Sequence, residues 1–138
     1  MNPTDSAIIL YAIVAAAILV YLPFTVVAYA RFQVGNDNSA PRAMFAQLPP
    51  YAQRATWAHQ NSFETFIIFS AAALMAYVTG QSSSLATGAA IAFVIARAFY
   101  SLFYIANIPL ARSLMFGIGT ASSFTLFVLS LRSISSSV

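Results

Sequence analysis

Residues 6–30, SAIILYAIVAAAILVYLPFTVVAYA, decide the fold, because they carry no charged side chain over a length that can cross a lipid bilayer. A hydrocarbon core about 30 Å thick requires roughly 20 helical residues. Pro23 lies inside the run, where it removes one backbone hydrogen bond and is expected to kink the helix rather than end it. The stretch therefore predicts a membrane-spanning helix.

The composition of the whole chain is that of a membrane protein. Of its 138 residues, 60% are hydrophobic and 7% are charged, whereas roughly a quarter of the residues of a soluble domain are charged. The six basic residues are all arginine and are scattered among apolar segments. They do not form the basic stripe on a soluble surface that indicates nucleic-acid binding. With one histidine and no cysteine, we expect neither a thiolate nucleophile nor a metal site.

Three further apolar stretches, at about 51–79, 85–107 and 109–131, are also long enough to span a bilayer. Isolated strands cannot cross lipid, because every backbone polar group there must be paired within the protein. We therefore expect an all-α, integral membrane four-helix bundle that forms a single domain over residues 1–138. The link between the last two spans is so short that these helices must be antiparallel neighbours.

The distribution of arginines predicts the orientation in the membrane. Arg31, Arg42 and Arg54 flank the first loop and Arg112 flanks the third, whereas Arg132 stands alone on the other side. Because cytoplasmic loops are enriched in arginine and lysine, both termini are expected on the non-cytoplasmic side. A short first loop and the lack of a signal-peptide pattern favour a bacterial inner membrane.

Two polar faces lie inside the predicted spans, where charged residues are costly and usually face the bundle interior or a wet cavity. Helical spacing places Arg54, Asn61 and Glu64 on one face, and Arg97, Tyr100 and Tyr104 on another. Glu64 is the only acid within a span, and Arg97 is the only base deep in one. Their depths roughly agree, which predicts an ion pair between them.

Each of these residues also has an ordinary structural interpretation. The pair of Arg97 and Glu64 is equally explained as a clamp between helices, and Tyr100 and Tyr104 as packing aromatics. His59 is better explained as an interfacial or loop-contacting residue than as a catalytic base. Arginines near a membrane surface commonly extend their heads to water without a further role. Only the combination of the two faces favours a functional site.

Three segments together resemble the MAPEG family, the membrane-associated proteins of eicosanoid and glutathione metabolism, and in particular a bacterial-type microsomal glutathione transferase. RATWAHQNSFE at 54–64 is similar to the family's basic stretch followed by Asn, two residues and Glu. ARAFYSLFY at 96–104 is similar to its Arg-x-x-Tyr-x-x-x-Tyr. NIPLARS at 107–113 is similar to the tight turn and arginine that open the family's fourth helix.

The resemblance implies a homotrimer with a glutathione site between neighbouring subunits, open toward the cytoplasm, and a lipophilic second substrate that arrives through the membrane lipids. It assigns glutathione binding to residues of three helices: Arg31, Arg54, Asn61, Glu64, Arg97, Tyr100 and Tyr104. It gives Arg112 the catalytic role of stabilising the glutathione thiolate. A neighbouring cation and a helix N-terminus both favour a thiolate over a thiol. Neither a metal nor a nucleic acid is implied.

Three functions follow from these observations. The first is a membrane glutathione transferase or peroxidase that acts on lipophilic electrophiles or lipid hydroperoxides. The second is a non-catalytic lipid-binding or scaffold member, because Trp57 and Gln60 stand where well-studied glutathione-using relatives have arginines, the strong partners of carboxylates. The third is a transporter or channel subunit, for which the chain lacks the inverted repeats typical of alternating access.

Overall fold

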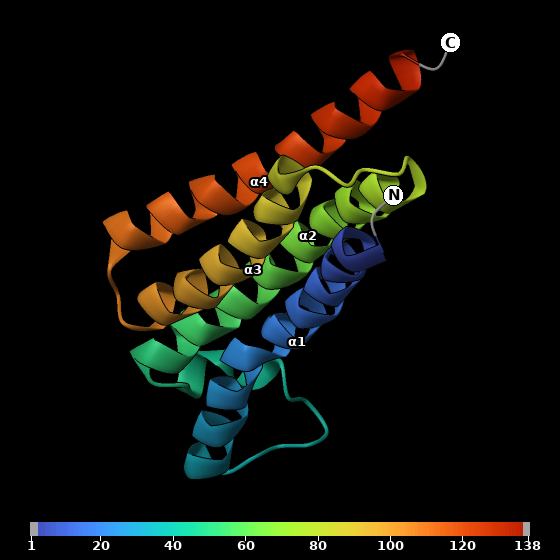
Figure 1. Ribbon diagram of the computed structural model, residues 1–138. Helices are drawn as coiled ribbons and strands as arrows, with labels where there is room; N and C mark the ends of the chain where they lie inside the picture. Colours follow the sequence, from blue (N-terminus) through green and yellow to red (C-terminus); the bar gives the residue numbers. More distant parts are fainter. Residues whose placement is uncertain (1–2, 137–138) are drawn as a thin grey trace.

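The computed structural model describes residues 3–136, which form four long helices in the order expected from hydropathy (Figure 1). These are α1 (Pro3–Val34), α2 (Pro50–Val78), α3 (Ser84–Ile105) and α4 (Pro109–Ser135). A short 3-10 helix, η1 (Ala43–Gln47), lies in the first loop. The described part of the chain contains no strand, and each of the four helices is long and apolar enough to cross a membrane.

The helix ends follow from local sequence. Pro109 occupies the first turn of α4, where its missing N–H costs nothing because that group has no helical partner. The Ser83 side chain caps α3 by accepting a hydrogen bond from the Ala86 N–H at 3.2 Å. Gly80 and Asn107 end α2 and α3 with φ angles of 70° and 60°, a left-handed conformation that glycine and asparagine tolerate best.

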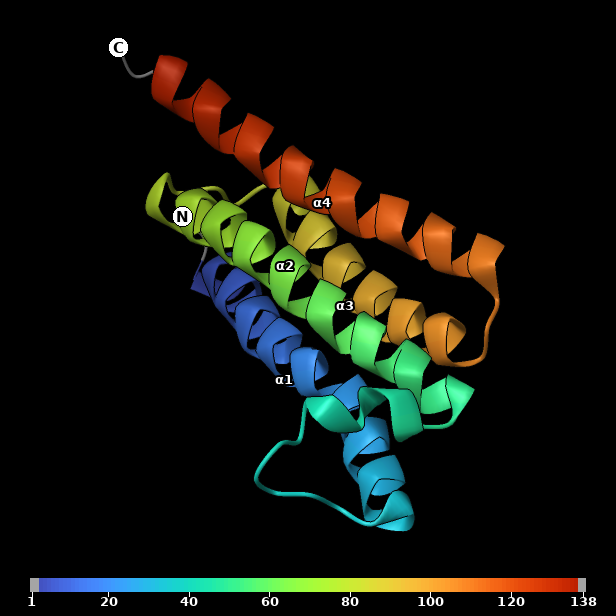
Figure 2. The ribbon, with the colours of Figure 1, turned by 180° about the vertical axis from the view of Figure 1, so that it is seen from behind.

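The first helix continues through Pro23 and extends past the apolar stretch to Val34. It changes direction partway along, so its C-terminal part projects beyond the bundle and leads into the first loop (Figure 2). This matches the kink expected at Pro23. Near the bend, the Nδ1 atom of His59 in α2 lies 2.6 Å from the carbonyl oxygen of Val20. His59 therefore connects α2 to the bent part of α1.

The four helices pack as a bundle in which α2 and α3 lie between α1 and α4 (Figure 1). Alanines at the helix contacts allow the backbones to approach closely, as is common in membrane bundles. At the centre the rings of Phe69 and Phe93 stack with centroids 3.8 Å apart. The main cluster of buried residues draws on every helix: Ile9, Ala12, Ala16, Phe69, Ala72, Ala73, Ala76, Ala86, Ala89, Ala90, Phe93 and Leu126.

The connections alternate between the two ends of the bundle. The loops that follow α1 and α3 lie at one end, and the link between α2 and α3 lies at the other (Figure 2). In the first loop, Met44 and Leu48 are buried, and Leu48 packs with Val27 and Ala52 in a second apolar cluster. The loop is thus held against α2 at the same end where α4 begins.

Candidate functional site

Arg97 is the centre of a polar cluster buried between α2 and α3. Its side chain is only 4% exposed, and its Nη2 donates hydrogen bonds to Asn61 Oδ1 at 3.0 Å and to Ser62 Oγ at 3.2 Å. The guanidinium carbon lies 3.8 Å from the centroid of the Tyr100 ring, one turn further along α3. All three partners are neutral, so this cation is held by dipoles and an aromatic face rather than by a counter-ion.

The expected direct ion pair between Arg97 and Glu64 does not occur in the described chain. Asn61 stands between the two: its Oδ1 accepts from Arg97, and its Nδ2 lies 3.5 Å from Glu64 Oε2, a long contact. Glu64 itself is exposed on the outer surface of α2. Asn61 and Glu64 share one face of α2. The Asn61 side chain is nearer to Arg97 and accepts the hydrogen bond from its guanidinium, so the Glu64 carboxylate stays outside the bundle.

A second cation, Arg112, lies one turn beyond this cluster, near the junction of α3 and α4. The Arg112 guanidinium carbon is 4.6 Å from the centroid of the Tyr104 ring. Tyr104 in turn meets Tyr100 edge-to-face, with centroids 5.6 Å apart. Arg97, Tyr100, Tyr104 and Arg112 therefore form one continuous row. Arg112 lies in the first turn of α4, where the helix dipole adds positive potential.

The same end of the bundle also carries Arg54 and an aromatic rim. The Nε of Arg54 donates to the carbonyl oxygen of Ile105 at 3.1 Å, which ties the start of α2 to the end of α3. Trp57 is 42% exposed and lies between Phe45 of the first loop and Tyr104, with ring centroids 5.7 and 6.4 Å away. The rim is thus built from the first loop, α2 and α3.

Arg31 lies apart from this row. It lines a cavity of about 480 Å³ between α1, the first loop and α2, on a different side of α2 from Asn61. The residues around this cavity are Phe24, Val27, Arg31, Pro41, Arg42, Phe45, Thr56, His59, Gln60 and Phe63. Within one chain, contacts therefore link five of the eight sequence-predicted site residues: Asn61, Arg97, Tyr100, Tyr104 and Arg112. Glu64 lies beside Asn61 on the exposed face of α2, Arg54 bonds to the end of α3, and Arg31 faces a different cavity.

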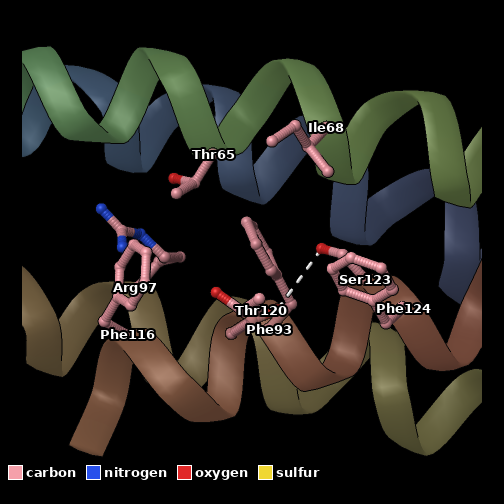
Figure 3. Close-up of a pocket in the computed structure, with 9 residues that line it drawn as sticks. Thr65, Ile68, Phe93, Arg97, Phe116, Thr120, Ser123 and Phe124 are labelled. Carbon is pink, nitrogen blue, oxygen red and sulfur yellow. Dashed lines mark hydrogen bonds between the residues drawn. The ribbon is translucent and has the colours of Figure 1, made fainter. Parts of the chain in front are cut away.

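A smaller cavity of about 130 Å³, which we call the inner cavity, lies between α2, α3 and α4. Figure 3 shows Arg97 at one end of its row of side chains and Ser123 and Phe124 at the other. Its lining residues are Thr65, Ile68, Phe93, Arg97, Phe116, Gly119, Thr120, Ser123 and Phe124. Sequence reasoning selected only Arg97 among them. The small and hydroxyl residues of GIGTASS at 117–123, an unusually polar run within an apolar span, were the available signal.

Within residues 3–136, the structure brings together no group of three side chains from His, Cys, Asp and Glu. The candidate site contains arginine, tyrosine and amide groups, which suit the recognition of carboxylates and other oxyanions.

A comparison with protein families matches the chain to the MAPEG family, whose model covers residues 8–132. No curated protein and no solved structure matches the chain. The match includes most of each of the four helices and the whole polar row. Together with the four apolar helices, it identifies an integral, multi-pass membrane protein of all-helical fold.

Proposed function

The chain belongs to the MAPEG family, and on that premise we propose that it is a membrane-bound glutathione transferase or peroxidase. Its second substrates are lipophilic electrophiles or lipid hydroperoxides. The observation that carries the proposal is the continuous row from Arg97 through Tyr100 and Tyr104 to Arg112. This row ends in a cation in the first turn of α4, which is the electrostatic setting that a thiolate requires.

In the proposed reaction, Arg112 stabilises the thiolate of glutathione. A thiol has a pKa near 8.5 in water, and a neighbouring cation lowers it so that more thiolate is present at neutral pH. In conjugation, the sulfur forms a bond to an electrophilic carbon, whose leaving group or epoxide oxygen takes the electron pair. In peroxide reduction, two glutathione molecules become one disulfide while the hydroperoxide becomes an alcohol and water.

The remaining residues of the row have binding roles in this proposal. Arg54, Asn61 and Glu64 hold the carboxylates and amine of glutathione, and Arg97, Tyr100 and Tyr104 complete the pocket. Among the described residues, the only hydrogen bond from the Arg54 side chain is that of Nε to Ile105, so its terminal nitrogens can face a carboxylate. Arg31 fits only as a residue contributed by a neighbouring subunit, since it lies on another face of its own chain.

A homotrimer is part of the proposal, and the exposed surface of α2 supports it. A stripe of exposed residues, spaced alternately by four and three, runs along this helix; we call it the α2 stripe: Gln60, Glu64, Ile67, Ala71, Leu74 and Val78. A 3.5-residue repeat is the pattern of helices that pack against copies of themselves. Glu64 lies midway along α2, where a carboxylate facing lipid would be costly. A neighbouring subunit would cover it.

The proposed location is a bacterial inner membrane, with both termini on the non-cytoplasmic side. The arginine distribution supports this orientation, because the loops after α1 and α3, which arginines flank, lie at one end of the bundle. Glutathione is an intracellular, water-soluble thiol, so the polar row and Arg112 would then face its source. A lipophilic substrate would enter sideways from the bilayer.

The test is a glutathione titration of the purified protein in detergent, with thiolate absorbance as the readout. We expect saturable binding at millimolar glutathione. Arg112→Ala should lower turnover roughly 100-fold, the scale for removing one oxyanion-stabilising group, with a smaller effect on binding. Arg132→Ala is the matched control, because Arg132 is an exposed arginine at the other end of the same helix. An absence of saturable glutathione binding would overturn the proposal.

A non-catalytic lipid-binding or scaffold role is the second candidate, and Trp57 favours it. The exposed indole stands on the rim beside Tyr104, at a position from which an arginine would reach a carboxylate. A lipid or protein partner that co-purifies with the chain, in the absence of any thiolate signal, would support this role over the transferase.

A further inference from the structure

The cavity between α1, the first loop and α2, which we call the loop cavity, carries positive charge without a counter-ion from the protein. Arg31 and Arg42 line it, whereas none of its lining residues in the described chain is acidic. Neither guanidinium makes a hydrogen bond or an ion pair within residues 3–136. Asp37, the acid of the first loop, accepts from the backbone and hydroxyl of Ser39 instead. The loop cavity therefore favours an anionic ligand.

The depth of the two arginines matches the headgroup layer of a bilayer. Arg31 is in the last turn of α1, and a rise of about 1.5 Å per residue puts it roughly 37 Å along the helix from Ser6, the start of the apolar stretch. A hydrocarbon core is about 30 Å thick, so the Arg31 head lies beyond it. Arg42 is exposed in the first loop at the same end (Figure 2). Both cations thus lie at the level of lipid phosphates.

The lining of the loop cavity becomes apolar with depth. Along α1, Phe24 lies two turns deeper than Arg31, and along α2, Phe63 lies one turn deeper than His59. The Phe63 ring meets the Tyr21 ring edge-to-face, with centroids 5.8 Å apart, and both residues are exposed. These aromatics extend the deep end of the cavity onto the outer surface of α1 and α2. The cavity is thus charged at its loop end and open to hydrocarbon at its other end.

We infer that the loop cavity binds one anionic phospholipid, with its phosphate at Arg31 and Arg42 and an acyl chain along Phe24 and Phe63. Arginine binds phosphate oxygens through paired, charge-assisted hydrogen bonds, and arginines at a membrane surface attract anionic headgroups. The cavity volume of about 480 Å³ lies within the range of roughly 300–1,000 Å³ that is typical of ligand pockets. The inference does not rest on the proposed transferase activity, because it gives Arg31 a ligand within its own chain.

The distribution of polarity selects this class of ligand. A water-soluble phosphate ester would occupy the loop end of the cavity alone and leave the apolar end without a ligand. A zwitterionic lipid carries an ammonium group, which two unpaired guanidinium groups repel. An anionic phospholipid supplies both a negative charge for the arginines and a hydrocarbon chain for the phenylalanines.

The first experiment titrates the full-length protein in neutral detergent and counts bound molecules by native mass spectrometry. The probes are dioctanoyl phosphatidylglycerol, dioctanoyl phosphatidylcholine and inorganic phosphate. We expect one phosphatidylglycerol per chain, bound at least tenfold more tightly than phosphatidylcholine, and no measurable binding of inorganic phosphate. Equal affinity for the two lipids would overturn the inference. Phosphate binding as tight as that of phosphatidylglycerol would also overturn it, because the acyl chain would then contribute nothing.

Two arginine substitutions locate the lipid. Arg42→Gln removes a cation from the loop cavity, at an exposed position where the fold does not depend on the side chain, and should weaken phosphatidylglycerol binding at least fivefold. Arg132→Gln removes the same charge at the other end of the bundle and should leave binding unchanged. An equal loss in both variants would show that net charge attracts the lipid, and unchanged binding by Arg42→Gln would place the lipid elsewhere. Either result would overturn the inference.

Glutathione is the competing anion, since the proposed transferase assigns Arg31 of a neighbouring chain to it. The affinity for phosphatidylglycerol should be the same with and without saturating glutathione, and Arg42→Gln should leave the glutathione thiolate signal intact. Displacement of the lipid by glutathione would assign the loop cavity to glutathione and overturn the inference. A protein that binds phosphatidylglycerol but gives no thiolate signal would retain this inference and lose the transferase proposal.

Discussion

At the scale of single residues, Asn61 is the group that organises the polar row. Its side-chain oxygen accepts from Arg97 while its nitrogen faces Glu64, so the amide separates a buried cation from an exposed carboxylate. The helical spacing in the sequence predicted that Asn61, Glu64 and Arg97 would lie close together. The predicted ion pair between Arg97 and Glu64 was wrong, because Asn61 accepts the hydrogen bond from the guanidinium. The choice between the two α2 side chains depends on side-chain length and rotamer rather than on spacing.

Substitution of Asn61 tests this arrangement. Asn61→Leu removes one acceptor of a buried charged donor, which should destabilise the protein by about 1–3 kcal/mol. Asn61→Asp keeps the acceptor and adds a charge opposite to that of Arg97, and should retain most of the thermal midpoint in detergent. Gln33→Leu, at an exposed amide side chain in the last turn of α1, is the control. A thermal midpoint of Asn61→Leu equal to that of the control would show that the hydrogen bond contributes no stability.

At the scale of helices, α3 is the element on which the site depends. Phe93 of α3 stacks on α2, and Arg97 of α3 is buried in the interior. Both tyrosines of the row also belong to α3. The sequence predicted the position of all four spans, since apolar length sets them. It placed the ends of α1 and α4 too early, near Ala30 and Leu131, because hydropathy reports contact with lipid whereas helical hydrogen bonds continue into the polar flanks.

Removal of the central ring should affect both stability and the site. Phe93→Ala deletes one partner of the Phe69 stack and enlarges the inner cavity that Phe93 lines. Truncation of a buried phenylalanine costs about 3–5 kcal/mol, which should appear as a clearly lowered thermal midpoint. Phe99→Ala, an exposed phenylalanine on the same helix, should change the midpoint little. Similar midpoints for the two variants would contradict the central role of the stack.

At the scale of the whole molecule, the arrangement of helices decides which cations meet. The resemblance to the MAPEG family implied that Arg31 and Arg97 take part in one glutathione site. The structure separates the two arginines because α1 packs on one side of the α2–α3 pair and α4 packs on another side. The side on which a helix packs depends on three helices together. The sequence pattern of a single helix therefore does not predict it. Arg31 can lie near an Arg97 only where that Arg97 belongs to a neighbouring chain.

The α2 stripe gives a test of assembly. Leu74→Trp places a bulky ring on the stripe and should break the proposed trimer into single chains, as judged by the detergent-corrected mass in solution. Leu102→Trp is the matched control on α3, since the two leucines are similarly exposed, at 48% and 53%. If the two variants have the same mass as the unmodified protein, α2 does not form the contact between chains.

The position of Trp57 has a practical consequence. It is the only tryptophan in the chain, and it touches the first loop through Phe45 and the polar row through Tyr104. Native fluorescence therefore comes from one indole at the mouth of the candidate site. Its emission wavelength and anisotropy report how the loop moves against α2 and α3, without any label or substitution.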